Sequence, residues 1–219
     1  GLGNHEYYGG AEAGLRHYFA RFPELKPKRW YRRDVRGLAV IMLDSNPKYV
    51  GQRMWRQQVA WFADELQKID ADPKIRGAVV FLHHPVYTNS SKHRDHKPSN
   101  RDFRPLFERS RKAMVMISGH VHTYERFARG RKMYLNSGGG GAPRRPLLTG
   151  DARRHKDDLY RGPKLRPFHY VWVELTDRGL RWTAHGLQRG DKKLHVMDRF
   201  ETPWPGSAPA APPPKRKAR

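Results

Sequence analysis

The sequence contains no cysteine, which limits the chemistry that the chain can perform. Disulfide bonds, thiolate nucleophiles and zinc sites with thiolate ligands are all excluded. Acidic residues are scarce, because 21 Asp and Glu stand against 44 Lys and Arg, which gives a formal net charge of +23. Any metal ion would therefore have to bind through His, Asn, Asp or Glu.

Long hydrophobic runs are also missing. The two longest, 38–43 and 78–82, have the length of strands and fall far short of the roughly 20 apolar residues that cross a bilayer. We therefore predict no membrane span. The chain starts without Met, without a basic leader and without an apolar leader, so we expect an N-terminally truncated segment, and the sequence assigns no cellular location.

The positive charge is spread along the chain, because segment 203–219 carries only four of the basic residues. Such a field attracts anionic partners, phosphoesters or nucleic acid, without selecting between them. A base-composition bias in the source genome is an equally weighted explanation of the excess of Arg.

Apolar runs alternate with helical patterns in the middle of the chain. We predict buried strands at 37–43, 78–82 and 113–117, and helices at 52–69 and 101–111. This alternation predicts an α/β fold in which helices cover a sheet, with functional sites at the carboxyl ends of the strands.

The rest of the chain contains weaker signals. We predict, in chain order, a long loop at 86–101, a strand at 132–135, an irregular segment at 142–167 and a hairpin of strands 168–175 and 180–186. The Ala- and Pro-rich basic segment 203–219 is predicted to be a disordered tail, which leaves one domain over residues 1–202.

Imidazole side chains gather where predicted strands end. His83 ends the second strand, His120 and His122 follow the third, and Asn4 lies at the start of the chain. Neutral imidazole and amide oxygen suit a borderline divalent ion, so we expect Asn4, His83, His120 and His122 to converge. In an extended segment, His120 and His122 would point the same way and serve one metal or two adjacent ones. Any one of these His taken alone is more often structural.

Three ordered motifs give the sequence a family resemblance. Gly3-Asn4-His5-Glu6, Val80-Phe81-Leu82-His83 followed by His84-Pro85, and Gly119-His120-Val121-His122 resemble motifs of the calcineurin-like metallophosphoesterase superfamily. The last motif, continued by Thr123-Tyr124-Glu125-Arg126, is most similar to the purple acid phosphatase branch. The resemblance implies an α/β fold with a layered β-sandwich flanked by helices, here truncated at the N-terminus.

The resemblance also implies a dinuclear site with two divalent or trivalent metal ions, iron, manganese or zinc. Asn4, His83 and His120 would bind one metal and His122 the other. His5 would lie beside the scissile phosphate as a proton donor or charge stabiliser, and is the candidate catalytic residue.

Part of the family pattern is absent. The superfamily's Asp-x-His and Gly-Asp-x-x-(Asp/Asn/Tyr) motifs would precede Gly3, so the chain holds about half of the ligands, and we expect it alone to be a poor enzyme. Asp151, Asp157 and Asp158 lie in an irregular basic segment and offer no substitute. His84 matches no ligand position and either packs, the favoured interpretation, or lines the substrate side.

Two classes of function remain open. The favoured hypothesis is a metal-dependent phosphoesterase, a phosphoric ester hydrolase with a phosphoester substrate. The alternative is a basic nucleic-acid-binding protein, or a nuclease on the same fold. Only the charge supports nucleic acid as a partner, because the sequence contains no recognised nucleic-acid motif.

Overall fold

A six-stranded sheet forms the centre of the molecule in the computed structural model, which describes residues 1–188 and 190–207. Its strands are β1 (Tyr31–Val35), β2 (Leu38–Met42), β3 (Gly77–Leu82), β4 (Ala113–Ser118), β5 (Tyr124–Arg129) and β6 (Lys132–Ser137), in the order β1-β2-β3-β4-β6-β5. The four inner strands are parallel, and the edge strands β1 and β5 are antiparallel to their neighbours.

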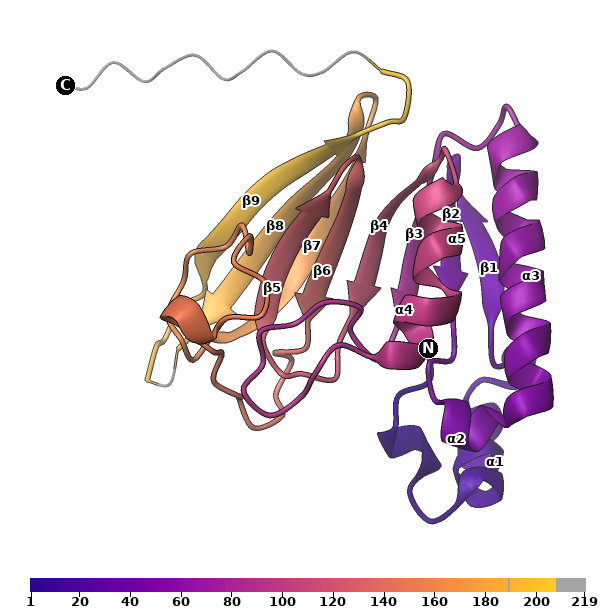
Figure 1. Cartoon of the computed structure of the whole chain (residues 1–219), viewed down its shortest axis with the longest axis horizontal. Helices are drawn as coiled ribbons and strands as arrows, with labels where there is room; N and C mark the ends of the chain where they lie inside the picture. Colours follow the sequence, from indigo (N-terminus) through magenta and orange to yellow (C-terminus); the bar gives the residue numbers. More distant parts are fainter. Residues whose placement is uncertain (189, 208–219) are drawn as a thin grey trace.

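Helices cover one face of this sheet (Figure 1). The covering helices are α3 (Gln52–Ala71), α4 (Lys97–Asp102) and α5 (Arg104–Arg109). Phe62 of α3 is fully buried, and its ring meets the ring of Phe103 edge-on at 5.9 Å. Two further helices, α1 (Ala11–Arg21) and α2 (Pro47–Val50), lie beyond the lower edge of the sheet in Figure 1.

A second, three-stranded sheet packs on the opposite face. It consists of β7 (Phe168–Thr176), β8 (Gly179–Leu187) and β9 (His195–Pro203), with β8 in the middle. Trp182 of β8 is buried in one cluster with Val115 and Leu135 of the large sheet. The layers are therefore helices, large sheet and small sheet, which confirms the predicted α/β sandwich flanked by helices.

The inner strands are apolar throughout because both of their faces are covered. In β3, for example, Val79 belongs to the cluster under the small sheet and Val80 to the cluster under the helices. The predictions of strands at 37–43, 78–82, 113–117 and 132–135, of the helix at 52–69 and of the hairpin are confirmed within a few residues.

Two predictions around residue 100 were wrong. The single helix expected at 101–111 is two short helices, α4 and α5, which begin around Pro98 and Pro105. A proline fits the first turn of a helix, where its missing N–H is not needed, but interrupts a longer helix. Because α4 starts at Lys97, the loop after β3 is also shorter than the expected 86–101.

Some elements were not expected from the sequence. They are α1, α2, β1, β5 and β9.

The start of the predicted tail is part of the fold. Pro203 and Trp204 were assigned to the tail, yet β9 ends at Pro203. Trp204 is buried against the core, and its indole N–H donates to Thr176 O at 3.1 Å. Residues 208–219 of the predicted tail lie outside the described residues. Within the described part of the chain, no helix is long and apolar enough to span a membrane.

Candidate metal centre

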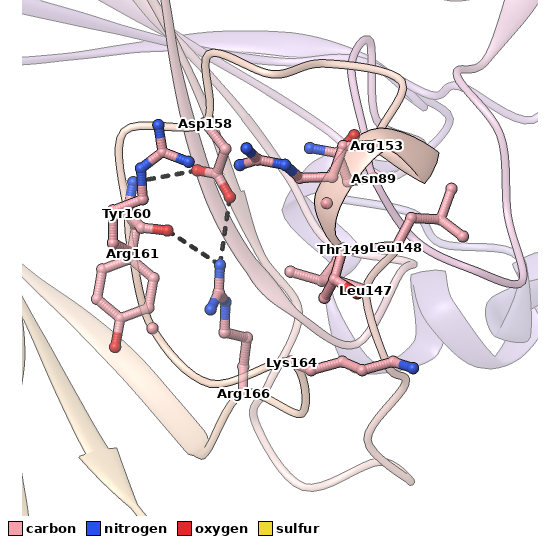
Figure 2. A pocket seen from close by; sticks show the side chains of 12 residues that line it. Asn89, Leu147, Leu148, Thr149, Arg153, Asp158, Tyr160, Arg161, Lys164 and Arg166 are labelled. Carbon is pink, nitrogen blue, oxygen red and sulfur yellow. Dashed lines mark hydrogen bonds and ion pairs between the residues drawn. The ribbon is translucent and has the colours of Figure 1, made fainter.

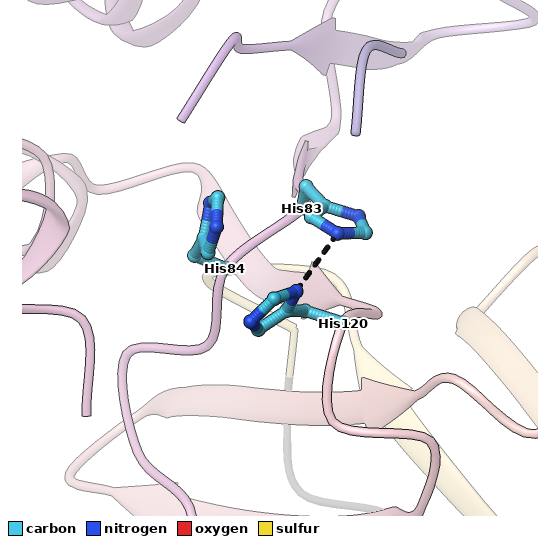
Figure 3. Close-up of side chains that lie close together, drawn as sticks. All are labelled: His83, His84 and His120. Carbon is cyan, nitrogen blue, oxygen red and sulfur yellow. Dashed lines mark hydrogen bonds between the residues drawn. The ribbon is translucent and has the colours of Figure 1, made fainter. Parts of the chain in front are cut away.

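The ends of β3 and β4 bring three metal-binding side chains together. His83 directly follows β3, and His120 lies two residues beyond β4. Because β3 and β4 are parallel neighbours, their carboxyl ends meet at one edge of the sheet, where Gly119 N–H donates to His83 O at 3.1 Å. His83 Nε2 and His120 Nδ1 lie 3.0 Å apart (Figure 3).

The amide of Asn4 completes this group from the start of the chain. Asn4 Oδ1 lies 2.6 Å from His83 Nε2 and 3.3 Å from His120 Nδ1. Asn4 and His83 are 79 positions apart in sequence. The structure thus brings together three of the four predicted ligands, and we call Asn4, His83 and His120 the triad.

The segment that carries Asn4 is anchored on both sides of it. Glu6 accepts a hydrogen bond from Gly3 N at 2.6 Å, and the phenol of Tyr7 donates to buried Asp44 after β2. Gly3 lies so close to His83 that a Cβ there would come within 2.8 Å of His83 Nδ1. Only glycine therefore allows the backbone to approach the triad in this way.

The two histidines of the triad are neutral because their partial burial disfavours the charged form. Desolvation, with smaller effects of neighbouring imidazoles, lowers the pKa of His83 to about 3 and that of His120 to about 3. An uncharged imidazole has one ring nitrogen with a free lone pair, which is the form that binds a metal. Two imidazole nitrogens and one amide oxygen from three chain segments, at mutual distances of 2.6–3.3 Å, fit a single borderline cation.

His122 lies near the triad but does not join it. Its Nδ1 donates to Pro143 O at 2.8 Å, which leaves Nε2 as an acceptor. A metal-binding imidazole commonly donates its other N–H to a backbone carbonyl in this way. The same arrangement therefore suits the expected second ligand position.

The extended backbone expected at His120 and His122 was wrong. Both residues have left-handed backbone conformations, with φ of 55° and 50°, and the segment between β4 and β5 is a loop. Such values are uncommon for residues with a side chain and concentrate at functional sites. The two imidazoles consequently do not point the same way by strand periodicity, and each has its own set of contacts.

His5 lies beside the triad on the exposed side. Its ring stacks on Tyr8 at 4.4 Å, and Tyr8 Oη lies 3.1 Å from His5 Nε2. No hydrogen bond joins it to the triad within the described residues. Its position is compatible with contact to a substrate rather than with metal binding.

Three further histidines surround the triad and were not predicted as site residues. The ring of His93 meets that of His120 at 4.5 Å, and the ring of His84 lies 4.4 Å from that of His120 and 4.5 Å from that of His96. Ring nitrogens of His83, His84 and His120 lie within 4.8 Å of one another. The signal was present in the sequence, because His84, His93 and His96 share the His-rich segment after β3.

No carboxylate belongs to this group within the described residues. Asp158, one of the acids weighed from the sequence, lies instead beside a cavity of about 180 Å³ (Figure 2). It accepts hydrogen bonds from Arg166 at 3.2 Å and from Arg126 N at 3.0 Å. The Asp158–Arg166 ion pair therefore fixes the basic segment after β6 and supplies no ligand.

The sequence has recognisable relatives. Probable purple acid phosphatase 20 of Arabidopsis thaliana is 30% identical over 139 residues, which cover 58% of this chain and 30% of that protein. Purple acid phosphatase 22 of the same plant is 33% identical over 100 residues, which cover 46% of this chain and 22% of that protein. The chain thus matches less than a third of the length of these relatives. No family model matches it.

A solved structure shares the fold. GAP50, the anchor in the inner membrane complex of Plasmodium, has a TM-score of 0.65 at 14% identity, over 81% of this chain and 55% of that one. The likeness extends over the layered fold, with the Asn–His group of this chain at the ends of its strands. Over part of its length, the chain is thus similar in sequence to purple acid phosphatases, in agreement with the motif resemblance.

Proposed function

We propose that this chain carries the histidine-rich half of a metal-dependent phosphoesterase that hydrolyses phosphate esters at a dinuclear centre. The observation that carries the proposal is the triad, in which Asn4 Oδ1, His83 Nε2 and His120 Nδ1 lie within 3.3 Å of one another. The similarity to purple acid phosphatases supports phosphate esters as the substrate class and a hydrolase as the class of enzyme.

Asn4, His83 and His120 would hold one metal, and His122 Nε2 would be a ligand for a second. Imidazole suits zinc and iron, and the amide oxygen suits manganese, so these metals are our candidates. A metal ion bound there would polarise a phosphoryl oxygen and lower the pKa of a water molecule from 15.7 to about 7.

The chain's own groups would orient the substrate and move a proton. His5, exposed and held by Tyr8, is proposed to protonate the leaving oxygen of the ester. The hydrogen bond from His122 Nδ1 to Pro143 O keeps Nε2 free of a proton, as a ligand requires. The left-handed backbone at His120 and His122 sets the direction in which the two side chains leave the loop.

Nucleic acid binding is not supported as the alternative. The relatives are phosphatases, and several basic side chains have partners inside the fold. Arg126, for example, pairs with Asp198 at 2.8 Å, and Arg166 pairs with Asp158.

Hydrolysis of p-nitrophenyl phosphate by the metal-depleted chain, before and after addition of zinc, manganese or iron, tests the proposal. We expect a slow, metal-dependent rate that the H120A variant loses and that a variant of exposed His17, H17A, retains. A rate equal to that of the buffer with every metal, or equal rates for both variants, would contradict the proposed function.

A further inference from the structure

His84 lies against the triad, and its orientation is fixed by a residue far away in sequence. Its Nδ1 lies 3.0 Å from the hydroxyl of Ser45, which follows β2 and is fully buried. The ring is enclosed between the rings of His96 and His120 (Figure 3 shows it beside His120). His84 therefore has one ring nitrogen held inside the protein.

The hydrogen bonds of Ser45 determine which nitrogen of His84 carries the proton. Ser45 Oγ accepts from the backbone N–H of His83 at 3.1 Å and of His84 at 2.9 Å. A hydroxyl has two lone pairs and one hydrogen. Because both lone pairs are used, the hydrogen points to His84 Nδ1, and the proton of the ring lies on Nε2.

This tautomer argues against metal binding by His84. A ring that binds a metal through Nε2 carries its proton on Nδ1. Ser45 Oγ would then face three N–H donors with two lone pairs, and its own hydrogen would have no acceptor among the described residues. Ring nitrogens of His84, His83 and His120 lie within 4.8 Å of one another. Because of the tautomer of His84, this closeness does not indicate a metal site with three histidine ligands.

His84 Nε2 is also free to meet a ligand. It has no hydrogen-bond partner within the described residues, and it is not among their buried atoms that lack one, so it remains accessible. An N–H beside a metal centre finds its natural acceptor in an anionic oxygen. The His84 ring lies 4.4 Å from the His120 ring, and a ring nitrogen of His84 lies within 4.8 Å of ring nitrogens of His83 and His120.

We propose that His84 is a catalytic residue whose Nε2–H donates a hydrogen bond to an oxygen of the phosphate group bound at the triad, and that Ser45 is the positioning residue that fixes its tautomer. This inference rests on the proposed function for its substrate class. Because the ring and its hydroxyl partner are already in place, the donor needs no rearrangement as negative charge develops on that oxygen.

Calorimetric titration of inorganic phosphate into the zinc-loaded chain tests the donor. We expect H84F, which keeps a ring without the N–H, to bind zinc within about twofold of the wild type and phosphate on the order of tenfold more weakly. H84Q restores an N–H near the position of Nε2 and should recover most of the phosphate affinity. The H17F variant, at an exposed site, should change neither. Unchanged phosphate binding in H84F, or a loss of zinc in proportion to phosphate, would overturn the inference.

Nitrogen-15 NMR of the histidine rings tests the tautomer directly, in the metal-free chain. We expect the proton of His84 on Nε2 in the wild type and a mixture of tautomers in S45A. A proton on Nδ1 in the wild type would overturn the inference even if zinc does not bind. A chain that binds zinc and phosphate through His84 but hydrolyses no ester would refute the proposed function and leave the inference standing.

Discussion

In two histidines of the site, the contact of one ring nitrogen determines whether the other ring nitrogen donates or accepts. His122 gives one proton to a backbone carbonyl, and His84 accepts one from Ser45, so the two rings present opposite chemistry at the free nitrogen. The positions of Asn4, His83, His120 and His122 at predicted strand ends predicted that all four converge, and the first three do. The tautomer of His84 was not predictable, because it depends on a residue 39 positions away.

His5 is the residue whose proposed role differs most from that of the triad. We expect the H5A variant to retain its metal and to lose turnover on the order of 10² to 10⁴-fold, because the leaving oxygen then departs without a proton. The loss should be smaller for aryl esters, whose leaving groups need little protonation. Metal analysis and rates for paired aryl and alkyl phosphates measure both effects. Loss of metal in proportion to activity, or equal slowing of both esters, would assign His5 to metal binding or to the scaffold.

In the large sheet, the strands that the sequence predicted correctly are those that are buried on both faces, and the strands it did not predict lie at the edges. β2, β3 and β4 are covered on both faces and appear in the sequence as continuous apolar runs. β1 and β5 are edge strands with charged residues, such as Arg33 and Glu125, so their composition gave no strand signal. β5 nevertheless carries a buried carboxylate, because Glu125 accepts hydrogen bonds from Thr88 and Asn136 and ties the loop after β3 to the sheet.

Glu125 makes the unfolding free energy of the protein depend on pH. Burial raises the pKa of Glu125 to about 7, against the effect of its three hydrogen bonds. The folded state therefore holds a proton that the unfolded state releases at the ordinary pKa of 4.5. The resulting stability is fully present below pH 4.5 and is lost as the pH rises through about 7, with a slope of at most about 1.4 kcal/mol per pH unit.

Urea unfolding of the wild type and of E125Q between pH 4.5 and pH 8 measures this contribution. We expect the difference in unfolding free energy between the two proteins to shift in favour of E125Q as the pH rises. The exposed variant Q57A, on α3, serves as the control and should keep a constant difference from the wild type. A constant difference for E125Q as well would show that Glu125 does not titrate in this range.

The molecule as a whole carries a formal charge of +23 and one histidine-rich site at one edge of its sheet. Its charge attracts anions at long range, whereas recognition of a phosphate group is proposed to depend on the site. The fold could be predicted from the alternation of apolar runs and helices together with the motif resemblance. The left-handed turns at His120 and His122 could not, because they depend on loop contacts made only in the folded chain.

Varying the salt concentration distinguishes long-range attraction of anions by the surface charge from recognition of a phosphate group at the site. We expect hydrolysis of a small phosphomonoester to change little between about 50 and 200 mM salt, because a screened surface charge contributes little to a contact at the metal centre. Binding of a DNA duplex should weaken steeply over the same range. Rates and fluorescence anisotropy measured in the same buffers give both dependences. A specific duplex affinity that resists salt would instead favour the nucleic-acid alternative.

Asn4, His83 and His120 are proposed to form a metal site. Calorimetric titration of zinc into the wild type, H120A and the exposed-site control H17A tests it most directly. We expect the wild type and H17A to bind zinc with the same affinity and H120A to lose this binding. Equal zinc binding by all three proteins, or no zinc binding by the folded wild type, would contradict it.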